Sequence, residues 1–402
     1  MIDKKFDPAS AVQDEQNFGE FGGVNPSITD SSTYTFMQAE SMEGTFEGET
    51  EGCYLYSRHW NPTNKYLADA LARMEGAEAA QVVGSGMAAI SNVAMQICES
   101  GDHIVSSQTI YGGTYSLFHF YLPKFNINTT LLDITDLAAV EAAIKPNTKM
   151  IFCEVMSNPL LEIADLKALS ELAHKNGIKL VVDNTFTPMI FSPLKFGVDV
   201  VIHSLTKFIN GSSDTVAGVI CGTEEFINSL MDLNTGSTML LGPTMDGVRS
   251  ASVMKNLRTL HIRMVQHSKN AMYIAENLKK DGMTVRYGGL SDHPSHALMN
   301  AQMNDDYGYG GMVLIDCKTK ENAYKLMNAM QKDNVGYLAV SLGFYKTLFS
   351  APGSSTSSEI PEEEQGDMGL SPGLIRMSVG LDMDVERTYD TIKVRLKEIG
   401  LI

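Results

Sequence analysis

Short apolar runs alternate with amphipathic segments through the middle of the chain. Seven runs have the length and composition of buried strands, and they span residues 79–83, 103–107, 129–133, 149–154, 178–183, 199–204 and 216–222. Apolar residues at helical spacing fill most of the intervals, as in ADLKALSELAHKNG (164–177), and they also mark Asn64 to Glu75 before the first run. Strands that are apolar throughout and separated by helices are typical of a mainly parallel sheet covered on both faces. We therefore predict an α/β fold with a seven-stranded sheet.

The pattern divides the chain into three parts. Residues 1–60 carry Gly, Ser, Thr and acidic residues with little periodicity, which predicts an extended N-terminal arm. A structureless segment of this length is uncommon unless it has a task or a partner. Residues 61–255 hold the runs and form the predicted large α/β domain. Residues 256–402 form a predicted smaller α+β domain. A helical region at 244–280 leads into it, and a final helix is predicted at 384–398. Between them lie strand candidates at 310–317, 335–341 and 374–380.

The composition is that of an ordinary globular protein. Of 402 residues, 44% are apolar and 20% are charged, and the 34 Gly and 13 Pro are unremarkable, which excludes collagen-like and disordered chains. Asp and Glu total 48 against 31 for Lys and Arg, so the net charge is −17 at pH 7. Such a field repels the phosphates of nucleic acids, and no basic run interrupts it. We expect no nucleic-acid partner.

The cysteines, histidines and apolar stretches bear on location and on metals. The five cysteines include no C-x-x-C pair, and the nine histidines show no spacing typical of metal ligands. We therefore expect neither a disulfide framework nor a metal site. The amino-terminal MIDKKFDPASAVQDEQ lacks the apolar core of a signal peptide, and no apolar stretch approaches the roughly 18 residues that cross a bilayer. We expect a cytoplasmic protein with no membrane partner.

The strongest chemical signal is a lysine between hydroxyl residues at a strand end. Ser204 ends the run at 199–204, and Thr206 and Lys207 follow it, where α/β sheets bind their ligands. A lysine amine can form a Schiff base with an aldehyde cofactor while neighbouring hydroxyl groups hold the cofactor's phosphate. Asp183 ends another run. A carboxylate there can keep a pyridinium nitrogen protonated, which makes the ring an electron sink.

A glycine-rich turn supplies the third part of this predicted site. The segment VGSGM (83–87) opens a helix after the first run, and the free N–H groups at a helix N-terminus suit a phosphate. Taken alone, each part has an ordinary explanation. A strand-end lysine need not form a Schiff base, Asp183 can cap the next helix, and the glycines can form a tight turn. Together and in this order they fit pyridoxal 5′-phosphate (PLP) bound to Lys207.

The sequence resembles the Cys/Met-metabolism family of PLP-dependent enzymes over nearly its whole length. The resemblance rests on YSRHWNPT (56–63), GSGMAAI (84–90), YGGT (111–114), EVMSNP (154–159), VVDNTF (181–186), HSLTKF (203–208), NLRTLHIRM (256–264) and GLIRMSVG (373–380). Four further motifs resemble plant-type methionine γ-lyases: FGEFGGVNPSITDSST (18–33), MLLGPTM (239–245), DYGYGG (306–311) and SLGFYKTLFSAPGSSTSSE (341–359). The resemblance implies the aspartate aminotransferase-like fold of PLP-dependent transferases (fold type I), with a smaller α+β C-terminal domain.

The resemblance implies a role for each residue around the cofactor. Lys207 carries PLP as a Schiff base and shuttles protons, while Asp183 faces the pyridine nitrogen. Asn158 touches the ring hydroxyl. The cofactor phosphate is held by Ser204, Thr206 and the N–H groups of Gly86 and Met87.

The resemblance also implies roles near the substrate and between subunits. Tyr111 stacks on the ring and acts as an acid or base near the leaving group. Arg376 grips the substrate carboxylate as a two-pronged donor, with Ser341 close by. Tyr56 and Arg58 reach the phosphate of a neighbouring subunit's cofactor. The N-terminal arm would then complete the active site of a neighbouring subunit. The resemblance therefore implies a homo-oligomer with shared active sites, which is a tetramer in most of the family. The substrate pocket also includes Tyr56 and Gly113.

Ordinary explanations stay open for several of these residues. Arg58 and Arg376 can be partners in surface salt bridges. Tyr111 can be a buried aromatic residue, and Asn158 can belong to a plain turn. Three polar residues near the site in sequence are interpreted as supporting or core residues rather than catalysts: Glu154, His203 and Asp214.

The reaction implied by the resemblance is the γ-elimination of L-methionine, or of a related sulfur- or homoserine-derived amino acid, to 2-oxobutanoate, ammonia and a thiol. Gly113 stands where many bacterial methionine γ-lyases have Cys, and FYKTL follows SLG (341–343) where cystathionine enzymes have an acidic residue. These differences do not decide the substrate. Cystathionine γ-lyase, cystathionine γ-synthase and O-acetylhomoserine sulfhydrylase stay alternatives, and so does a non-catalytic PLP-binding scaffold.

Overall fold

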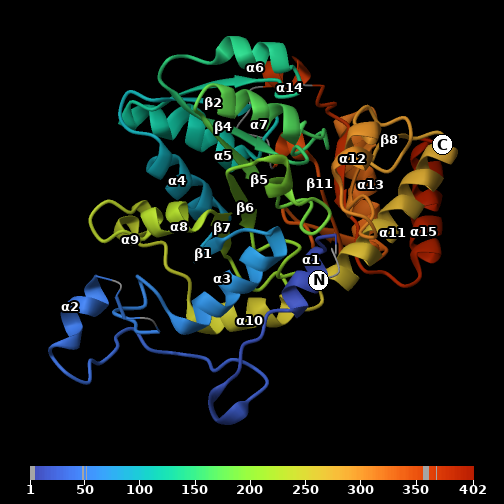
Figure 1. Cartoon of the computed structure of the whole chain (residues 1–402). Coiled ribbons are helices and arrows are strands. Elements are labelled where there is room, and N and C mark those ends of the chain that lie inside the picture. Colours follow the sequence, from blue (N-terminus) through green and yellow to red (C-terminus); the bar gives the residue numbers. More distant parts are fainter. Residues whose placement is uncertain (1–4, 48, 51, 356–361, 368) are drawn as a thin grey trace.

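A seven-stranded sheet forms the centre of the computed structural model, which describes residues 5–47, 49–50, 52–355, 362–367 and 369–402. The strand order is β1-β7-β6-β5-β4-β2-β3 (Figure 1). Each predicted run forms one strand: β1 Ala79–Val83, β2 His103–Ser107, β3 Asn128–Leu132, β4 Thr148–Glu154, β5 Lys179–Asp183, β6 Val200–Ser204 and β7 Gly218–Gly222. The predicted α/β fold is confirmed.

The sheet is mainly parallel, and β7 alone runs against the other strands. Parallel pairing joins β3 to β2, β2 to β4, β4 to β5 and β5 to β6. β7 is antiparallel to both β1 and β6. In the β4–β5 register Glu154 pairs with Asp183. The carboxyl ends of these strands therefore lie side by side at one edge of the sheet.

Both faces of the sheet are buried, and alternate residues of a strand enter different cores. On β4, Ile151 belongs to the core that includes α3 (Pro62–Glu75) and α7 (Leu166–Lys175). The next residue, Phe152, belongs to the opposite core, which includes α4 (Gly86–Ile97). Because both faces are covered, the strands are apolar throughout, and this made them recognisable in the sequence.

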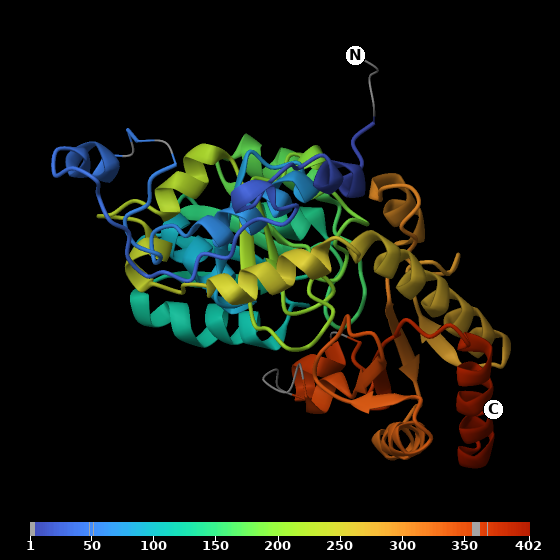
Figure 2. The same ribbon diagram turned by 90° about the horizontal axis from the view of Figure 1, so that it is seen from below.

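The C-terminal part forms a second sheet of five strands in the order β10-β11-β12-β9-β8. Figure 2 shows this part of the chain in orange and red. Its strands are β8 Thr284–Arg286, β9 Met312–Asp316, β10 Gly336–Leu338, β11 Thr347–Ser350 and β12 Leu374–Ser378. Three helices share its core: α11 Leu260–Lys280, α13 Lys320–Lys332 and α15 Val385–Ile399. The α+β character of this part agrees with the prediction, but β8 and β11 were not predicted. With three and four residues, they are too short to show a periodicity, whereas the equally short β10 lies within the longer run predicted at 335–341.

The helical pattern predicted at 244–280 forms two helices. The first, α10 (Gly247–Leu257), packs against α3, whereas α11 packs against α15 and β8. The change of packing partner falls close to the expected boundary between residues 255 and 256. The exact domain limits stay a prediction.

The N-terminal arm contains two short helices, α1 (Pro8–Gln13) and α2 (Ser41–Phe46). α1 begins after Asp7, whose carboxylate accepts a hydrogen bond from the N–H of Ser10 at 2.8 Å. α2 projects away from the body of the molecule at the end of a long loop (Figures 1 and 2). Residues 1–4, 48 and 51 of the predicted arm lie outside the described part.

The remaining helical elements are short connections. The α-helices are α5 Gly112–Ser116, α6 Leu137–Ala143, α8 Glu224–Leu230, α9 Ser237–Leu241, α12 His296–Gln302 and α14 Glu362–Asp367. A π-helix spans Leu117–Tyr121, and 3₁₀ turns span Glu20–Gly22, Leu122–Phe125, Pro193–Phe196 and Pro352–Ser354. Within the described ranges, no helix is long and apolar enough to cross a membrane.

Candidate active site

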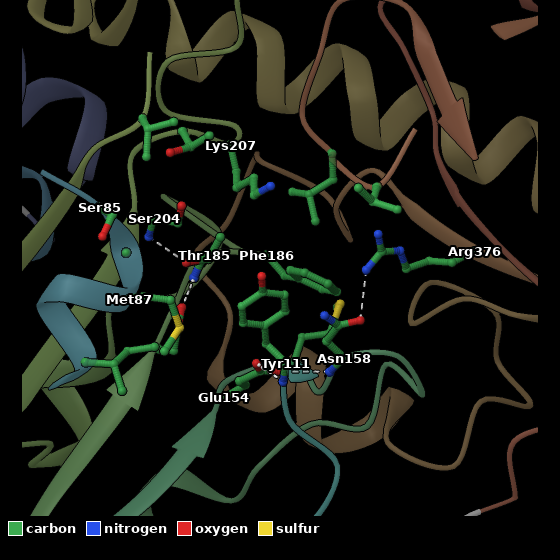
Figure 3. A pocket seen from close by; sticks show the side chains of 18 residues that line it. Ser85, Met87, Tyr111, Glu154, Asn158, Thr185, Phe186, Ser204, Lys207 and Arg376 are labelled. Atoms are coloured by element: carbon green, nitrogen blue, oxygen red, sulfur yellow. Dashed lines mark hydrogen bonds between the residues drawn. The ribbon is translucent and has the colours of Figure 1, made fainter. Parts of the chain in front are cut away.

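A cavity of about 210 Å³ lies at the carboxyl edge of β4, β5 and β6, where the C-terminal part faces the main sheet (Figure 3). Arg376 of β12 lines it together with the residues that end the parallel strands. The cavity brings together most of the predicted site residues: Gly86, Met87, Tyr111, Asn158, Asp183, Ser204, Thr206, Lys207 and Arg376.

Lys207 extends into the cavity from the turn that follows β6 (Figure 3). Its Nζ donates a hydrogen bond to Ser341 Oγ at 3.1 Å. Burial, and then the neighbouring charge of Arg376, lower the pKa of Lys207 to about 8. The amine therefore loses its proton more readily than an ordinary lysine. The neutral amine is the form that attacks an aldehyde.

The loop that carries Ser341 packs on the Lys207 turn through a glycine. Gly343 has a φ of +77°, and a Cβ at this position would lie 2.4 Å from the backbone nitrogen of Phe208. A residue with a side chain fits neither the backbone conformation nor the space. Close backbone packing therefore places Ser341 next to Lys207, although the two are far apart in sequence.

Asp183 ends β5 and is half-buried. Its Oδ1 accepts a hydrogen bond from the N–H of Thr185 at 2.8 Å, but Thr185 lies in a turn and no helix begins there, so the helix-capping explanation is wrong. The side chain still lines the cavity. Burial raises the pKa of Asp183, and the hydrogen bonds from Thr185 oppose this effect. Thr185 Oγ1 in turn accepts the N–H of Ser204 at 2.8 Å, which ties the ends of β5 and β6 together.

The start of α4 and the end of β6 form a cradle for an anion. Ser85 caps α4 by accepting the N–H of Ala88 at 3.0 Å. The N–H groups of Gly86 and Met87 lie in the first turn, so no earlier carbonyl of the helix pairs with them. A Cβ at Gly86 would lie 2.8 Å from Cβ of Ser204, so only glycine lets the two segments approach this closely. Backbone N–H groups, nearby hydroxyls and a helix N-terminus suit a phosphate group.

Arg376 provides a fixed positive charge on the other side of the cavity. The side chain is buried, with 3% exposed, so the surface salt-bridge explanation is wrong for this residue. Its Nη1 donates to Oδ1 of Asn158 at 2.9 Å, and Asn158 is buried too. Burial lowers the pKa of Arg376 to about 10, which leaves the guanidinium charged at neutral pH. A buried cation with donors to spare suits a carboxylate.

Tyr111 and Gly113 are coupled by close packing. Tyr111 is 42% exposed and lines the cavity, so it is not a buried aromatic residue. Gly113 does not line the cavity. A Cβ on it would lie 2.5 Å from Cε1 of Tyr111 and 3.2 Å from Sδ of Met87. A larger residue at 113 would therefore displace the Tyr111 ring.

Tyr56 and Arg58 lie outside the cavity lining of their own chain. Tyr56 is 45% exposed, and the Arg58 guanidinium lies 5.8 Å from the centre of its ring. Arg58 Nη1 donates to the carbonyl oxygen of Met239 at 2.7 Å. The structure of one chain therefore does not bring these two residues to the site, and their predicted service to a neighbouring subunit stays a prediction.

Sequence reasoning did not single out the apolar wall of the cavity. Its members are Ile90, Met156, Phe186, Val216, Val340 and Leu342. Thr185 was also missed as a lining residue, whereas Ser85 belongs to the predicted glycine-rich turn. Glu154, interpreted as a supporting residue, lines the cavity as well. Several belong to the quoted motifs, but a motif does not say which of its side chains turn towards a cavity.

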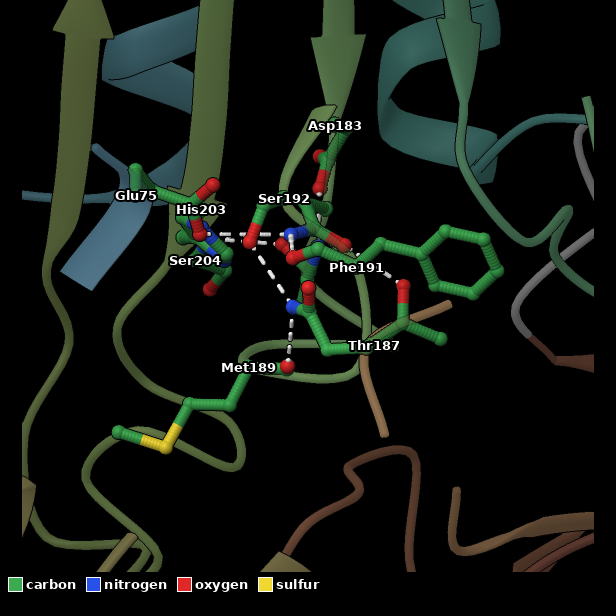
Figure 4. Close-up of polar contacts among 11 residues, drawn as sticks. Glu75, Asp183, Thr187, Met189, Phe191, Ser192, His203 and Ser204 are labelled. Carbon is green, nitrogen blue, oxygen red and sulfur yellow. Dashed lines mark hydrogen bonds and ion pairs between the residues drawn. The ribbon is translucent and has the colours of Figure 1, made fainter. Parts of the chain in front are cut away.

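A buried polar network lies near the strand ends (Figure 4). Nε2 of His203 lies 2.7 Å from Oε1 of Glu75, and the same oxygen accepts from Nδ2 of Asn184 at 3.3 Å. These residues are fully buried, in agreement with the interpretation of His203 as a core polar residue. Asp214 does not line the cavity and accepts a hydrogen bond from Asn210 at 2.8 Å. In the part of the chain that the structure describes, no group of three or more His, Cys, Asp or Glu is arranged to hold a metal.

Comparisons with known proteins find relatives over nearly the whole chain. The model of the family described as Cys/Met metabolism PLP-dependent enzyme matches residues 9–393. A methionine gamma-lyase of Arabidopsis thaliana is 47% identical over 390 residues, which are 95% of this chain and 88% of that protein. An O-succinylhomoserine sulfhydrylase of Pseudomonas aeruginosa is 38% identical and covers 92% of this chain and 91% of its own.

A solved structure is similar over the whole chain. It is a Campylobacter jejuni protein described as an O-acetylhomoserine (thiol)-lyase, with a TM-score of 0.91 and 28% sequence identity. The match covers 98% of this chain and 100% of that one, and that structure contains an N′-pyridoxyl-lysine-5′-monophosphate. The fold and the cofactor that the resemblance implied are thus confirmed.

We expect Gly86→Ala to weaken PLP binding about tenfold or more, the equivalent of losing one hydrogen bond to a charged group. The added methyl would lie 2.8 Å from Cβ of Ser204 and force the start of α4 away from the cradle. Titration of the cofactor-free protein with PLP, followed by absorbance, measures the affinity. Gly366→Ala is the control, because a Cβ there meets nothing within 4 Å. Equal affinities of the two variants would contradict the cradle.

The rate of covalent PLP uptake by the cofactor-free protein should rise with pH and level off above about 8, the lowered pKa of Lys207. Below this pH most Lys207 amines carry a proton and cannot attack the aldehyde, whereas above it most are neutral. Stopped-flow absorbance from neutral to strongly alkaline pH measures the rate. A rise that continues up to the ordinary lysine pKa would show that the amine is not perturbed in this way.

Proposed function

Because the chain belongs to the Cys/Met metabolism family of PLP-dependent enzymes, we propose that it catalyses the γ-elimination of L-methionine. Methionine and water would give 2-oxobutanoate, ammonia and methanethiol. The observation that carries this choice of substrate is the 47% identity, over 95% of the chain, to the Arabidopsis methionine gamma-lyase. The apolar wall of the cavity supports it, since an uncharged thioether loses little by leaving water for apolar surroundings.

The residues present fit PLP. A side chain at position 86 would not fit in the cradle between α4 and β6. The backbone N–H and hydroxyl groups of this cradle are the donors that a phosphate needs. In this proposal the phosphate binds there, Asp183 faces the ring nitrogen, Asn158 the ring hydroxyl, and Lys207 attaches covalently. When bound, PLP draws electrons from Cα of an attached amino acid, which makes the α-proton acidic enough to be removed.

The other tasks fall to side chains of the protein. Arg376 binds the substrate carboxylate and thereby orients the amino acid. Lys207 Nζ takes the proton from Cα, because its lowered pKa leaves a substantial fraction of the amine neutral at mildly alkaline pH. Tyr111 Oη donates a proton to the departing sulfur. The electron pair that breaks the Cγ–S bond comes from the removal of a second proton, from Cβ. Without the proton from Tyr111 the sulfur would have to leave as a thiolate.

A γ-replacement reaction is the second candidate. The 38% identity to an O-succinylhomoserine sulfhydrylase favours it specifically, because that relative covers nearly as much of the chain. In a replacement enzyme a thiol, rather than water, would complete the reaction. Cystathionine enzymes stay in the same class of alternatives. The non-catalytic scaffold is disfavoured, since Lys207, Asp183 and Arg376 converge on one cavity.

We further propose a cytoplasmic homo-oligomer, a tetramer as in most of the family, whose sites are shared between subunits. Arg58 and Tyr56 stand at the surface next to α9, outside the cavity of their own chain. Large apolar side chains are exposed along the arm and on α9: Phe18, Phe21, Val24, Met37, Leu240 and Leu241. A second copy would bury this surface and bring the two residues to its cavity.

The choice of substrate is tested with methionine as the sole amino acid. We expect 2-oxobutanoate and methanethiol in equal amounts, identified by chromatography. O-Acetylhomoserine with sulfide is offered in a separate reaction, and Lys207→Ala serves as the inactive control. If homocysteine and acetate form from the ester and sulfide while methionine yields no 2-oxobutanoate, the protein is a replacement enzyme and our proposal fails. Turnover of neither substrate favours the scaffold.

The shared site is tested by mixing two inactive variants, Arg58→Ala and Lys207→Ala, under conditions in which subunits exchange. Each hybrid dimer contains one site with both an intact Lys207 and an intact Arg58, so we expect activity to return. Lys207→Ala mixed with Asp183→Ala is the matched control, since those two residues line the same cavity within one chain. That mixture should stay inactive. Proven exchange without recovery in the first mixture would exclude donation across subunits.

A further inference from the structure

Glu154 holds two loops at the cavity with a single carboxylate. It ends β4 and is buried. Its Oε1 accepts the backbone N–H of Tyr111 at 2.9 Å, and its Oε2 accepts the backbone N–H of Asn158 at 2.7 Å (Figure 3). The two residues are 47 positions apart in the chain, and Glu154 lies between the loops that carry them.

The two loops carry the groups that surround the reacting centre in the proposed function. The side chains of Tyr111 and Asn158 both line the cavity. Asn158 also accepts a hydrogen bond from Arg376 at 2.9 Å through Oδ1. A continuous set of hydrogen bonds therefore runs from Tyr111 through Glu154 and Asn158 to Arg376. A shift of Glu154 would be transmitted to all three.

The charge of Glu154 matters for this arrangement. Burial and the neighbouring Asp183, its partner in the β4–β5 register, raise the pKa of Glu154, while the two N–H groups and Arg376 oppose that rise. An ionised carboxylate can accept a hydrogen bond at each of its two oxygens. Both acceptors are needed here, because two backbone N–H groups point at Glu154. A protonated carboxyl group, or an amide, would turn one acceptor into a donor that faces an N–H.

We propose that Glu154 is a positioning residue that sets where the Tyr111 ring and the Asn158 amide stand relative to the cofactor and substrate. This rests on the proposed function for the roles of those two side chains. Glu154 acts through them and does not itself exchange a proton in the reaction. A misplacement of about 1 Å in such a site typically costs about 100-fold in rate.

The test compares Glu154→Gln with the wild type. The amide keeps the size of the side chain, but its NH₂ group is a donor. One of the two backbone N–H groups would therefore face a donor instead of an acceptor. We expect kcat for methionine to fall about 10-fold to 100-fold with a smaller change in KM, and the visible circular dichroism of bound PLP to change, because that signal reports the surroundings of the ring. Glu141→Gln is the control, an exposed carboxylate paired with Lys175 on the surface. It should leave both signals unchanged.

Unchanged kcat and unchanged circular dichroism in a folded Glu154→Gln protein would overturn the proposal. If this variant does not fold, Glu154→Asp carries the test, because it keeps the charge but is one methylene too short to reach both N–H groups. We expect the same two effects, and wild-type values would again refute the role. The circular dichroism is recorded without substrate. If methionine is not the substrate, this signal still decides the role of Glu154 independently of the proposed reaction.

Discussion

The parallel register of β4, β5 and β6 is the constraint on which the rest of the structure depends. It brings Glu154, Asp183 and the turn after Ser204 to one edge of the sheet. Because alternate residues of each strand enter separate cores, a slip by one residue would turn every apolar side chain to the wrong core. The packing of the two cores thus fixes the register, and the register fixes where the polar strand ends meet.

Burial at this edge changes the ionisable groups that meet there. It lowers the pKa values of Lys207 and Arg376 and raises those of Asp183 and Glu154. Each charge is supported by a donor or acceptor placed beside it. Backbone N–H groups face the two carboxylates, and the amide oxygen of Asn158 faces the guanidinium. The protein therefore keeps charged groups in a buried place by surrounding them with fixed partners, as an enzyme site requires.

Much of this arrangement could be predicted from the sequence, because a strand covered on both faces is apolar throughout. The seven runs gave the main sheet, and their ends gave Asp183, Ser204 and Lys207. The short strands β8 and β11 could not be found, since three or four residues show no period. The apolar wall was missed because side-chain direction in loops depends on packing between the two sheets.

Glu154 shows a further limit of sequence reasoning. The sequence places it beside the site, but its contact with the backbone of Tyr111 arises only when β2 and β4 lie together and bring their following loops close. Tyr56 and Arg58 show a different limit, since one chain does not bring them to the cavity and the roles that we propose for them need a second copy. In both cases the missing information is a contact between segments far apart in the chain or between chains.

The covalent link between PLP and Lys207 is the central claim, and peptide mapping tests it most directly. The purified enzyme is treated with borohydride, which makes an imine bond permanent, then digested and examined by mass spectrometry. We expect the pyridoxyl group on the peptide that contains Lys207. A pyridoxyl group on another lysine, or an unmodified Lys207 in fully active enzyme, would contradict the claim.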